Sequence, residues 1–279
     1  MPGVWIRAST VPTEPITGIC EPAFALVAQG RKRTILGDRV FEYAAGECLV
    51  VSVDLPIVGQ VVAASKREPY LAVALTLKPA MIASLLLEGF AGGNGDEEPA
   101  GVAIHAASED LLDPVLRLLR MLDRRSDIAI LGPMVEREIL WRLLEGDQGA
   151  TVRAIGLADS RLSHVSRAIR WIRAHQAETL RMEELARIAA MGTSTFYRHF
   201  RAVTSMSPLQ FQKQLRLHEA RSRLIAGEQD IASVGFQVGY ESPSQFSREY
   251  GRMFGAPPSR DAERLRALKA DDREPARHV

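Results

Sequence analysis

The sequence predicts an α+β protein in which an antiparallel β-domain with two helices precedes an all-α domain that contains two helix-turn-helix motifs. Three observations support this fold class. Short apolar runs, broken by turn residues, fill residues 23–104. Helical spacing of apolar residues replaces that pattern after Ser108. Nearer the end of the chain, a pattern of two helices joined at a glycine occurs twice.

The first predicted domain is built of strands. Its apolar runs are strand-length, rich in Val, Ile, Tyr and Phe, and separated by turns such as those at Gly30 and Gly46. Such regular spacing is typical of an antiparallel sandwich or barrel. Residues 36–39 predict a tight hairpin, because Gly and Asp tolerate the positive φ that such turns need. Segment 92–101 predicts a flexible loop. Its glycines are not followed by a helix that begins with Lys and Ser or Thr, which argues against a phosphate-binding loop.

Two amphipathic helices follow the strands. Ser108 is placed to cap the first helix, and Gly146 ends the second, which spans about 126–145. Two such helices either cover a core or build a dimer interface, and the pattern is compatible with both roles. The residues expected on the inward faces are Leu112, Val115, Leu119 and Leu122 in the first helix, and Leu131, Val135, Ile139 and Leu143 in the second.

Charge divides the chain into two parts of opposite sign. From Thr151 to Val279 there are 21 Lys and Arg against 14 Asp and Glu, a net charge of +7. The first 150 residues hold the other 14 Lys and Arg against 20 Asp and Glu, a net charge of −6. An acidic sensor joined to a nucleic-acid module would show this division. Chance segregation of solvated surface charge is the alternative.

The sequence shows no targeting or disulfide signal. No basic region followed by an apolar core opens the chain, and no apolar run is long enough to cross a bilayer. We therefore expect a cytoplasmic protein without a membrane partner. Cys20 and Cys48 lack CxxC spacing and cannot form a disulfide framework. Both are expected to be buried thiols, and a redox role for either one stays open.

The first helix-turn-helix is predicted in the stretch RMEELARIAAMGTSTFYRHFRAVT. Leu185 and Ala186 are expected on the inward face of its first helix, and the flexible Gly192 at the turn. Phe196 and Phe200 are expected to point inward from the second helix.

The outward face of that second helix carries short polar groups beside arginine, which is the combination that a reader of the DNA major groove needs. Either Thr193 or Ser194 is placed to cap the helix. The outward residues are Ser194, Thr195, Tyr197, Arg198 and Arg201.

The same pattern recurs about fifty residues later. Gly239 is expected at the turn, and Ser242 as the cap of the second helix with Pro243 after it. Arg248 takes the place that Arg198 has in the first copy, and two aligned copies are far harder to obtain by chance than one. The expected inward residues are Ile231, Val234, Phe246 and Tyr250. The expected outward residues are Pro243, Ser244, Gln245, Ser247 and Arg248.

A single long helix is predicted between the two motifs, from Pro208 to about Ala226, where Gly227 ends it. A rigid connector would let both second helices enter successive major grooves, about 34 Å apart.

These stretches resemble the AraC/XylS family of transcription regulators. The resemblance rests on LARIAAMGTSTFYRHFRAVT, SPLQFQKQLRLHEAR and VGFQVGYESPSQFSREYGRMFGAPPSR. FALVAQGRKRTILGDRVFEYAAGECLVVSVDLPIVGQVVAAS and PYLAVALTL resemble the N-terminal domain of one AraC subgroup. The resemblance implies a cupin-like β-barrel sensor, a helical dimerisation element and a seven-helix DNA-binding domain.

The resemblance also implies roles for particular residues. In the family the first of the two reading helices does most of the base reading, which here falls to Ser194, Tyr197 and Arg198. The second maps to Ser244, Gln245, Ser247 and Arg248. Contacts to the DNA backbone are implied for Arg201 and Arg252.

Three positions depart from the family pattern. Gly235 stands where Ala is usual, which loosens its helix by up to about 1 kcal/mol. Ser205 replaces a common Gly, and Asp261 stands where many members have Tyr. None of the three falls on the base-reading face, so we expect them to affect local stability more than function.

The expected domain boundaries follow from these patterns. They are 1–107 for the β sensor domain, 108–146 for the helical dimerisation element, 147–162 for a linker, 163–262 for the DNA-binding domain and 263–279 for a tail.

The expected barrel carries no catalytic signature. It holds a single histidine, His105, whereas a metal-dependent cupin enzyme needs several metal ligands. We therefore expect no enzymatic activity, no metal and no other cofactor. The run Arg31-Lys32-Arg33 is either a solvated edge or a clamp for an anionic effector. Polar residues on apolar strands are the candidates for an effector pocket: Gln29, Tyr43, Ser52, Gln60 and Tyr70.

Together these features predict a sequence-specific regulator of transcription that binds double-stranded DNA. We expect a homodimer whose β-domain binds a small-molecule effector, with RNA polymerase as a further partner. The alternative is a constitutive DNA-binding protein without an effector.

Overall fold

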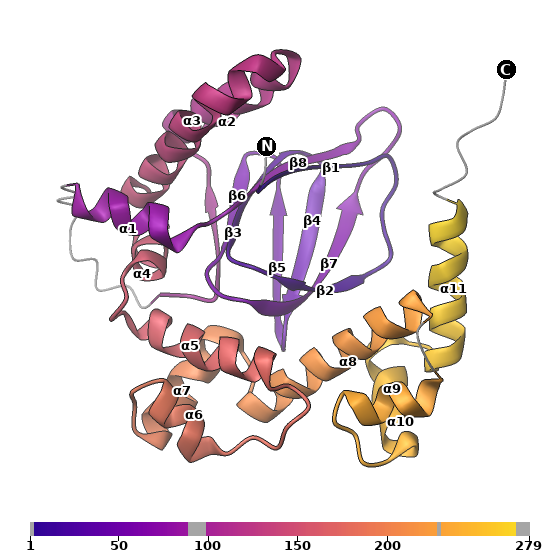
Figure 1. Ribbon diagram of the computed structural model, residues 1–279. Helices are drawn as coiled ribbons and strands as arrows, with labels where there is room; N and C mark the ends of the chain where they lie inside the picture. Colours follow the sequence, from indigo (N-terminus) through magenta and orange to yellow (C-terminus); the bar gives the residue numbers. More distant parts are fainter. Residues whose placement is uncertain (1–2, 89–98, 228–229, 272–279) are drawn as a thin grey trace, which may run out of the picture. The chain divides into compact units, whose positions relative to one another are not determined.

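The computed structural model describes residues 3–88, 99–227 and 230–271 (Figure 1). These described residues divide into two compact units. Those within 1–170 and 182–207 form one unit, and those within 171–181 and 208–271 form the other. Most of the loop predicted at 92–101 lies outside the described residues.

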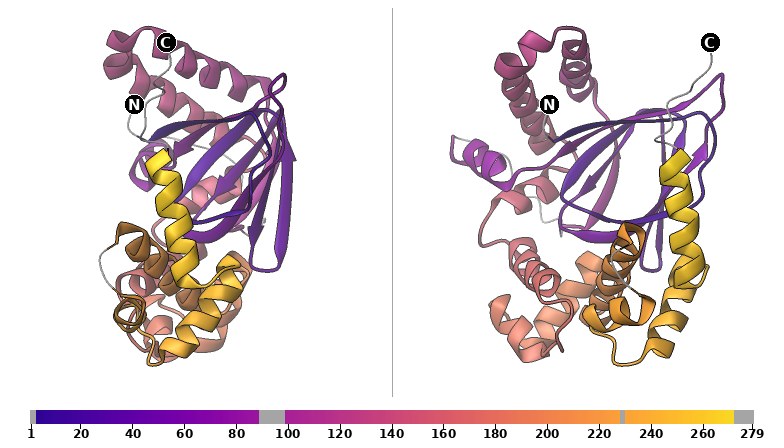
Figure 2. Two further views of the ribbon diagram at one scale, coloured as in Figure 1. Left: turned by 90° about the vertical axis from the view of Figure 1, so that its right-hand side faces the viewer. Right: turned by 45° about the vertical axis from the view of Figure 1, so that its right-hand side comes forward.

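The first unit contains two antiparallel sheets, which confirms the predicted β-domain (Figure 2). The five-stranded sheet has the order β1 (Val4–Ser9), β8 (Tyr70–Thr76), β3 (Ala23–Gln29), β6 (Glu47–Val51) and β9 (Val102–Ala106). The four-stranded sheet has the order β2 (Ile16–Cys20), β7 (Leu55–Ala63), β4 (Arg31–Leu36) and β5 (Arg39–Ala44).

The hairpin predicted at residues 36–39 is present. Leu36 pairs with Arg39, and Gly37 has a φ of +60°. A positive φ at the first central residue is what a type II′ turn requires, so glycine is needed at this position.

Strands β1 and β2 were not expected, because the predicted strands began at Ala23. Both lie at sheet edges, and Trp5, Ile6 and Ile16 are more than half exposed. An edge strand with exposed apolar residues lacks the alternation from which a strand is recognised.

Residue alternation determines which side chains of β4 face inward. Thr34 and Leu36 are buried, whereas Arg31 is exposed. The hydroxyls of Thr34 and Tyr43 lie 3.0 Å apart in a hydrogen bond, and Arg33 forms an ion pair with Glu42. Side chains alternate strictly along a strand, so Lys32 lies on the inner face with Thr34.

Four helices and a short 3-10 turn pack with the sheets in this unit. They are α1 (Pro79–Leu87), α2 (Glu109–Arg120), the 3-10 turn Met121–Asp123, α3 (Arg125–Glu145) and α4 (Gly149–Gly156). The Ser108 hydroxyl accepts a hydrogen bond from the Leu111 amide, so the predicted cap is confirmed. These helices share a core with the five-stranded sheet, whose residues include Phe24, Leu26, Val73, Leu75, Val115, Ile139 and Leu143.

Two parts of the helical prediction need correction. In α2 the most buried leucines are Leu111 and Leu118, while Leu122 is exposed, so the inward stripe is displaced by one position. In α3 Leu131 is also exposed, although Val135, Ile139 and Leu143 are buried as expected. Leu112 and Leu119 are partly buried and still pack against the core. Leu122 is exposed because α2 ends at Arg120 and the chain turns before it reaches this residue.

The segment 147–162, expected as a linker, contains helix α4, and α4 packs against α1 and α3. Its Val152 is fully buried in the same core. Helix α5 (Arg161–Ala174) follows it and begins at the end of the expected linker. Helix α1 was not expected at all, since its nine residues carry apolar side chains on most faces.

The second unit is helical. It contains α8 (Pro208–Ala226), α9 (Ile231–Gln237), α10 (Pro243–Phe254) and α11 (Pro258–Asp271). The long helix predicted from Pro208 to Ala226 is confirmed, and Gly227 follows it with a φ of +81°. Helix α11 extends into the segment expected as a tail. The core of this unit includes Leu217, Ala220, Leu224, Val234, Phe246 and Tyr250.

A buried carboxylate joins three helices of this unit. Asp261 on α11 is completely buried and accepts two hydrogen bonds from the guanidinium of Arg221 on α8, at 2.7 and 3.1 Å. It also accepts one from the Tyr250 hydroxyl of α10 at 2.9 Å and one from Arg264 at 3.1 Å. Burial alone would raise the pKa of Asp261, but these donors hold it below its usual value. Asp261, which stands where many family members have Tyr, thus accepts four hydrogen bonds within the fold.

No helix in the described part of the chain combines the length and the apolarity that crossing a bilayer requires.

We expect Asp261→Ala to lower the free energy of unfolding of the chain by about 3 kcal/mol, because it leaves Arg221 largely buried without its anion. Denaturant unfolding of the chain measures this change. The exposed Glu263→Ala, two residues further along α11, is the control and should change the free energy by less than about 0.5 kcal/mol.

The same network makes stability sensitive to acid. A carboxylate with a lowered pKa stabilises the folded state above the ordinary Asp pKa of about 3.9, and this contribution is lost as the pH falls through the lowered value. The difference in stability between the native chain and Asp261→Ala should therefore shrink below about pH 4. A difference that stays constant with pH would contradict a charged Asp261.

Candidate functional site

The first helix-turn-helix consists of α6 (Met182–Ile188) and α7 (Thr193–Thr204). Leu185 and Ala186 are buried in α6, as expected. Phe196 and Phe200 are fully buried and pack with their ring centroids 5.4 Å apart. These two rings fix the rotation of α7 about its axis. All five residues expected to point outward from α7 are exposed: Ser194, Thr195, Tyr197, Arg198 and Arg201.

The turn of this motif differs from the expectation. Ala190, not Gly192, has the left-handed conformation, with a φ of 48°. The Met191 amide donates to the carbonyl of Ala186 at 2.9 Å, which closes the end of α6. Gly192 has a φ of −68° and is the N-cap of α7. The expected side-chain cap from Thr193 or Ser194 is therefore wrong, because both residues lie inside the helix.

The second motif consists of α9 and α10, and its turn is as predicted. Gly239 has a φ of +92°, and the Ser242 hydroxyl accepts a hydrogen bond from the Gln245 amide. A Cβ on residue 239 would lie 2.4 Å from the carbonyl oxygen of Ala177, so both conformation and space require glycine. Asp230 caps α9 by accepting from the amides of Ala232 and Ser233.

The two motifs are not identical copies. Residues 189–192 separate α6 from α7, whereas residues 238–242 separate α9 from α10, so the second turn is one residue longer. Superposing the left-handed residues gives an offset of 49, from Ala190 to Gly239. The aromatic residues give an offset of 50, from Phe196 to Phe246. The extra residue of the second turn lies between these two positions.

The outward face of α10 agrees with the expectation at most positions. Phe246 and Tyr250 are fully buried. Ser247 is half-buried, and the Gln245 amide lies 3.4 Å from a carboxylate oxygen of Glu249. The exposed residues are Pro243, Ser244, Gln245, Arg248 and Arg252.

Gly235 has a structural reason in α9. A Cβ at this position would lie 3.0 Å from Cδ1 of Phe246, closer than side chains normally pack. The missing methyl group lets the two helices of the motif approach each other, and this offsets the helix-loosening effect of glycine.

Four polar residues that hold the second motif were not found from the sequence. Arg216 on α8 donates to the carbonyl of Gly239 at 2.8 Å and also to the carbonyls of Gln176 and Glu178. Glu249 accepts from the Tyr240 hydroxyl at 2.8 Å and pairs with Lys213 at 3.2 Å. Burial would raise the pKa of Glu249, but the donors Tyr240 and Lys213 hold it below its usual value. A hydrogen bond to a backbone carbonyl does not depend on the type of the accepting residue. The sequence pattern therefore did not indicate the role of Arg216.

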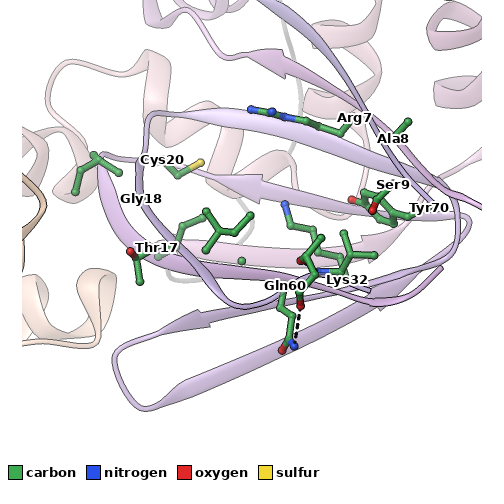
Figure 3. Close-up of a pocket in the computed structure, with 15 residues that line it drawn as sticks. Arg7, Ala8, Ser9, Thr17, Gly18, Cys20, Lys32, Gln60 and Tyr70 are labelled. Carbon is green, nitrogen blue, oxygen red and sulfur yellow. Dashed lines mark hydrogen bonds between the residues drawn. The ribbon is translucent and has the colours of Figure 1, made fainter. Parts of the chain in front are cut away.

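A cavity of about 420 Å³ lies within the β-domain, between strands of the two sheets (Figure 3). Two of the five residues expected in an effector pocket, Gln60 and Tyr70, line it. The other three lie elsewhere. Tyr43 is buried against Thr34, Ser52 donates to the carbonyl of Ala100, and Gln29 is half-buried at the end of β3.

The described residues contain no group of three or more His, Cys, Asp and Glu side chains arranged to hold a metal ion. His105 lies on β9, where its backbone carbonyl accepts from the Cys48 thiol.

Comparison with known proteins identifies the family. Residues 1–151, more than half of the chain, match the model of the AraC-type transcriptional regulator N-terminus. The chain belongs to the AraC family of transcriptional regulators. Residues 185–264 of this AraC-family chain also match a helix-turn-helix domain model.

Characterised relatives match the AraC-family chain over part of their length. The transcriptional activator RhaS of Escherichia fergusonii is 29% identical over 157 residues, which cover 53% of this chain and 52% of RhaS. The transcriptional regulator ArgR of Pseudomonas aeruginosa is 26% identical over 153 residues, which cover 55% of this chain and 46% of ArgR. The matched segments thus span about half the length of these relatives.

Solved structures share the fold. ToxT from Vibrio cholerae gives a TM-score of 0.55 at 11% identity and covers 94% of this chain and 98% of ToxT. A second ToxT structure, bound to (E)-4-(8-methylnaphthalen-1-yl)but-3-enoic acid, gives a TM-score of 0.53 at 11% identity, with 94% and 99% of the two chains covered. The resemblance confirms the mixed α+β fold.

We expect Ala190→Gly to raise the free energy of unfolding by up to about 1 kcal/mol, because glycine adopts the left-handed conformation without steric cost. Denaturant unfolding measures the change. Gly239→Ala at the matching turn should have the opposite effect, since it adds both the conformational cost and the contact with Ala177. A loss of stability in Ala190→Gly would contradict a left-handed conformation at residue 190.

Proposed function

We propose that the chain is a sequence-specific DNA-binding regulator of transcription. The observation that carries this proposal is the matched pair of helices α7 and α10. Each buries two aromatic side chains one turn apart and leaves an arginine, Arg198 or Arg248, on an exposed polar face. A helix anchored in this way presents a defined row of side chains to the major groove.

Base reading is assigned to the exposed residues of the two helices and to the half-buried Ser247. Arg198 and Arg248 can each pair with O6 and N7 of a guanine, and Gln245 with N6 and N7 of an adenine. Tyr197, with 44% of its surface exposed, offers an aromatic ring to a thymine methyl group. The contributing residues are Ser194, Thr195, Tyr197 and Arg198 on α7, and Pro243, Ser244, Gln245, Ser247 and Arg248 on α10. Arg201 and Arg252 contact the phosphate backbone, which positions the protein without reading sequence.

A small-molecule effector in the cavity of the β-domain is proposed to modulate this activity. Its volume of about 420 Å³ lies within the range of ligand pockets, and it combines apolar walls with a few polar groups. The bound small molecule in ToxT supports the view that a protein of this fold takes up such ligands.

A homodimer is proposed through helices α2 and α3. Exposed apolar side chains lie on these helices and on the 3-10 turn between them. An apolar groove of about 160 Å³ is lined by residues of β1, α2, the 3-10 turn and α3. A large exposed apolar patch on a protein usually marks an interaction site. The exposed residues are Leu116, Leu122, Ile130, Leu131 and Met134. RNA polymerase is proposed as a further partner, on the strength of the family alone.

Arg198→Ala tests the proposed function. Selection of a binding site from random DNA, followed by footprinting, should give a protected region of about 20 base pairs for the native chain. Arg198→Ala should lose about 1–3 kcal/mol of discrimination at one or two base pairs and retain weak nonspecific binding. Arg201→Ala is the control and should weaken binding to all sequences alike. A native chain that protects no specific region at low salt would rule out the proposal.

Ile130→Glu tests the dimer. Ile130 is 71% exposed, so its substitution should leave the fold intact and place a charge in the proposed interface. Analytical ultracentrifugation should show a dimer for the native chain and a shift toward monomer for the variant. Val40→Glu, at an exposed apolar position on β5, should leave the dimer unchanged. Two variants with the same effect would show that the interface lies elsewhere.

A further inference from the structure

The cavity of the β-domain is lined by strands of both sheets. On one side lie Arg7 and Ser9 of β1 and Tyr70 of β8, and Ser9 pairs directly with Tyr70 in the ladder. On the other side lie strands β2, β4 and β7, including Lys32 and the glycines at 18 and 59. Figure 3 shows the side chain of Lys32 extending into the space between the strands that carry Arg7 and Gln60.

The ionised groups that line the cavity are all positive. Arg7 and Lys32 contribute to its walls, and no Asp or Glu is among the described residues that line it. Lys32 reaches the cavity because it extends over Gly59, where an added Cβ would lie 3.3 Å from Cε of the lysine. Its neighbours in sequence, Arg31 and Arg33, have the opposite orientation on the strand. Of these three basic residues, Lys32 therefore faces the cavity, and Arg31 and Arg33 do not.

The positive charge of Lys32 is left uncompensated. Burial lowers the pKa of Lys32, the Cys20 group opposes this shift, and the charge of Arg7 adds to it. Burial also raises the pKa of the Cys20 thiol to about 11, so this neighbour is neutral at pH 7. Within the described residues, neither Arg7 nor Lys32 has an ion-pair or hydrogen-bond partner. Lys32 is half-buried and Arg7 is exposed. A partly desolvated cation without a counter-ion is stabilised when an anion binds to it.

Several other polar groups of the cavity are already engaged. The hydroxyl of Ser9 donates to the carbonyl of Val11, that of Thr13 accepts from the Val61 amide, and the Gln60 amide donates to the carbonyl of Thr13. Tyr70 differs from these. Its side chain is buried, and its hydroxyl has no hydrogen-bond partner within the described residues.

Burial raises the pKa of Tyr70 to about 12, against a smaller opposing effect of Arg7. The hydroxyl is therefore protonated at pH 7 and available as a donor. The donors left without partners, on Arg7, Lys32 and Tyr70, all suit an anion.

We infer that this cavity binds an organic anion, with its charged headgroup on Lys32, Tyr70 and Arg7 and its apolar body against Ile16, Ile19, Ile57 and Val61. This inference rests on the proposed effector function and names the chemical class of the effector. A carboxylate or a phosphate monoester provides the acceptor oxygens that the three donors require. A neutral polyol would leave the lysine charge uncompensated, and a metal cation would be repelled.

Matched pairs of ligands test the inference on the full-length chain. Octanoate is compared with octanamide, and phenylacetate with phenylacetamide, so that only the charge of the headgroup changes within a pair. Phenyl phosphate distinguishes a phosphate from a carboxylate preference. Ligand-induced shifts of the unfolding temperature, followed by titration calorimetry, give the affinities. We expect at least one anion to bind about tenfold or more tightly than its neutral partner, as a charge-assisted hydrogen bond implies.

Lys32→Met should abolish the preference for the anion and leave the chain at least as stable, because it removes a half-buried charge that has no counter-ion. Arg31→Met, one residue away on the exposed face of the same strand, is the matched control and should retain the preference. Tyr70→Phe should weaken anion binding without removing it. A preference that survives in Lys32→Met, or equal affinity for acid and amide, would overturn the inference.

Gly18→Leu locates the site. A Cβ at Gly18 meets no atom within 4 Å, so the leucine has room at the backbone and its side chain fills cavity space. This variant should weaken every ligand of the panel, and unchanged anion binding would overturn the assignment to this cavity. Site-specific DNA binding is measured on the same samples. If DNA binding is intact and no anion binds up to millimolar concentration, the inference fails and the proposed regulator stands.

Discussion

The burial of paired aromatic rings is the constraint on which the proposed DNA-binding function depends. Phe196 and Phe200 lie one helical turn apart on α7, and Phe246 and Tyr250 do so on α10. Two anchors four residues apart occupy one stripe of a helix, so they fix its rotation and leave the opposite stripe exposed. The identity of the exposed residues can then change without loss of the fold. A polar reading face is therefore separable from the apolar face that positions it.

Polar contacts refine what the aromatic residues establish. In the second motif, Arg216 binds the carbonyl of the turn residue Gly239, and Asp261 receives the hydroxyl of Tyr250. Neither contact involves the exposed face of α10. The aromatic core sets the rotation of α10, and these hydrogen bonds connect the motif to α8 and α11.

Much of this architecture could be predicted from the sequence because it depends on local periodicity. The hairpin at Gly37, the cap at Ser108, the helix from Pro208 to Ala226 and the inward aromatic residues all follow from patterns within a few residues. Strand β1 and helix α4 were missed because their apolar residues are recognised only by what they pack against. The exchange of roles between Gly192 and Ala190 has a different cause. Glycine is the residue that favours a left-handed turn, and here an alanine adopts it.

The candidate sites also divide into one that depends on local periodicity and one that depends on contacts between distant segments. The exposed faces of α7 and α10 were predictable, since helical spacing fixes them once the aromatic residues are placed. The cavity was not, because Arg7, Lys32 and Tyr70 come together only through the register of separate strands. Alternation alone could have shown that Lys32 differs from Arg31 and Arg33. It could not have shown that Tyr70 lies across from it.

The close approach of Gly235 to the ring of Phe246 links two positions eleven residues apart in the chain. A larger residue at 235 requires a smaller or displaced ring at 246, and a smaller ring at 246 leaves a void that a methyl group at 235 would fill. Among homologues, these two positions are therefore expected to change together. An alignment in which one varies freely while the other stays constant would mark lineages whose second motif has a different helix spacing.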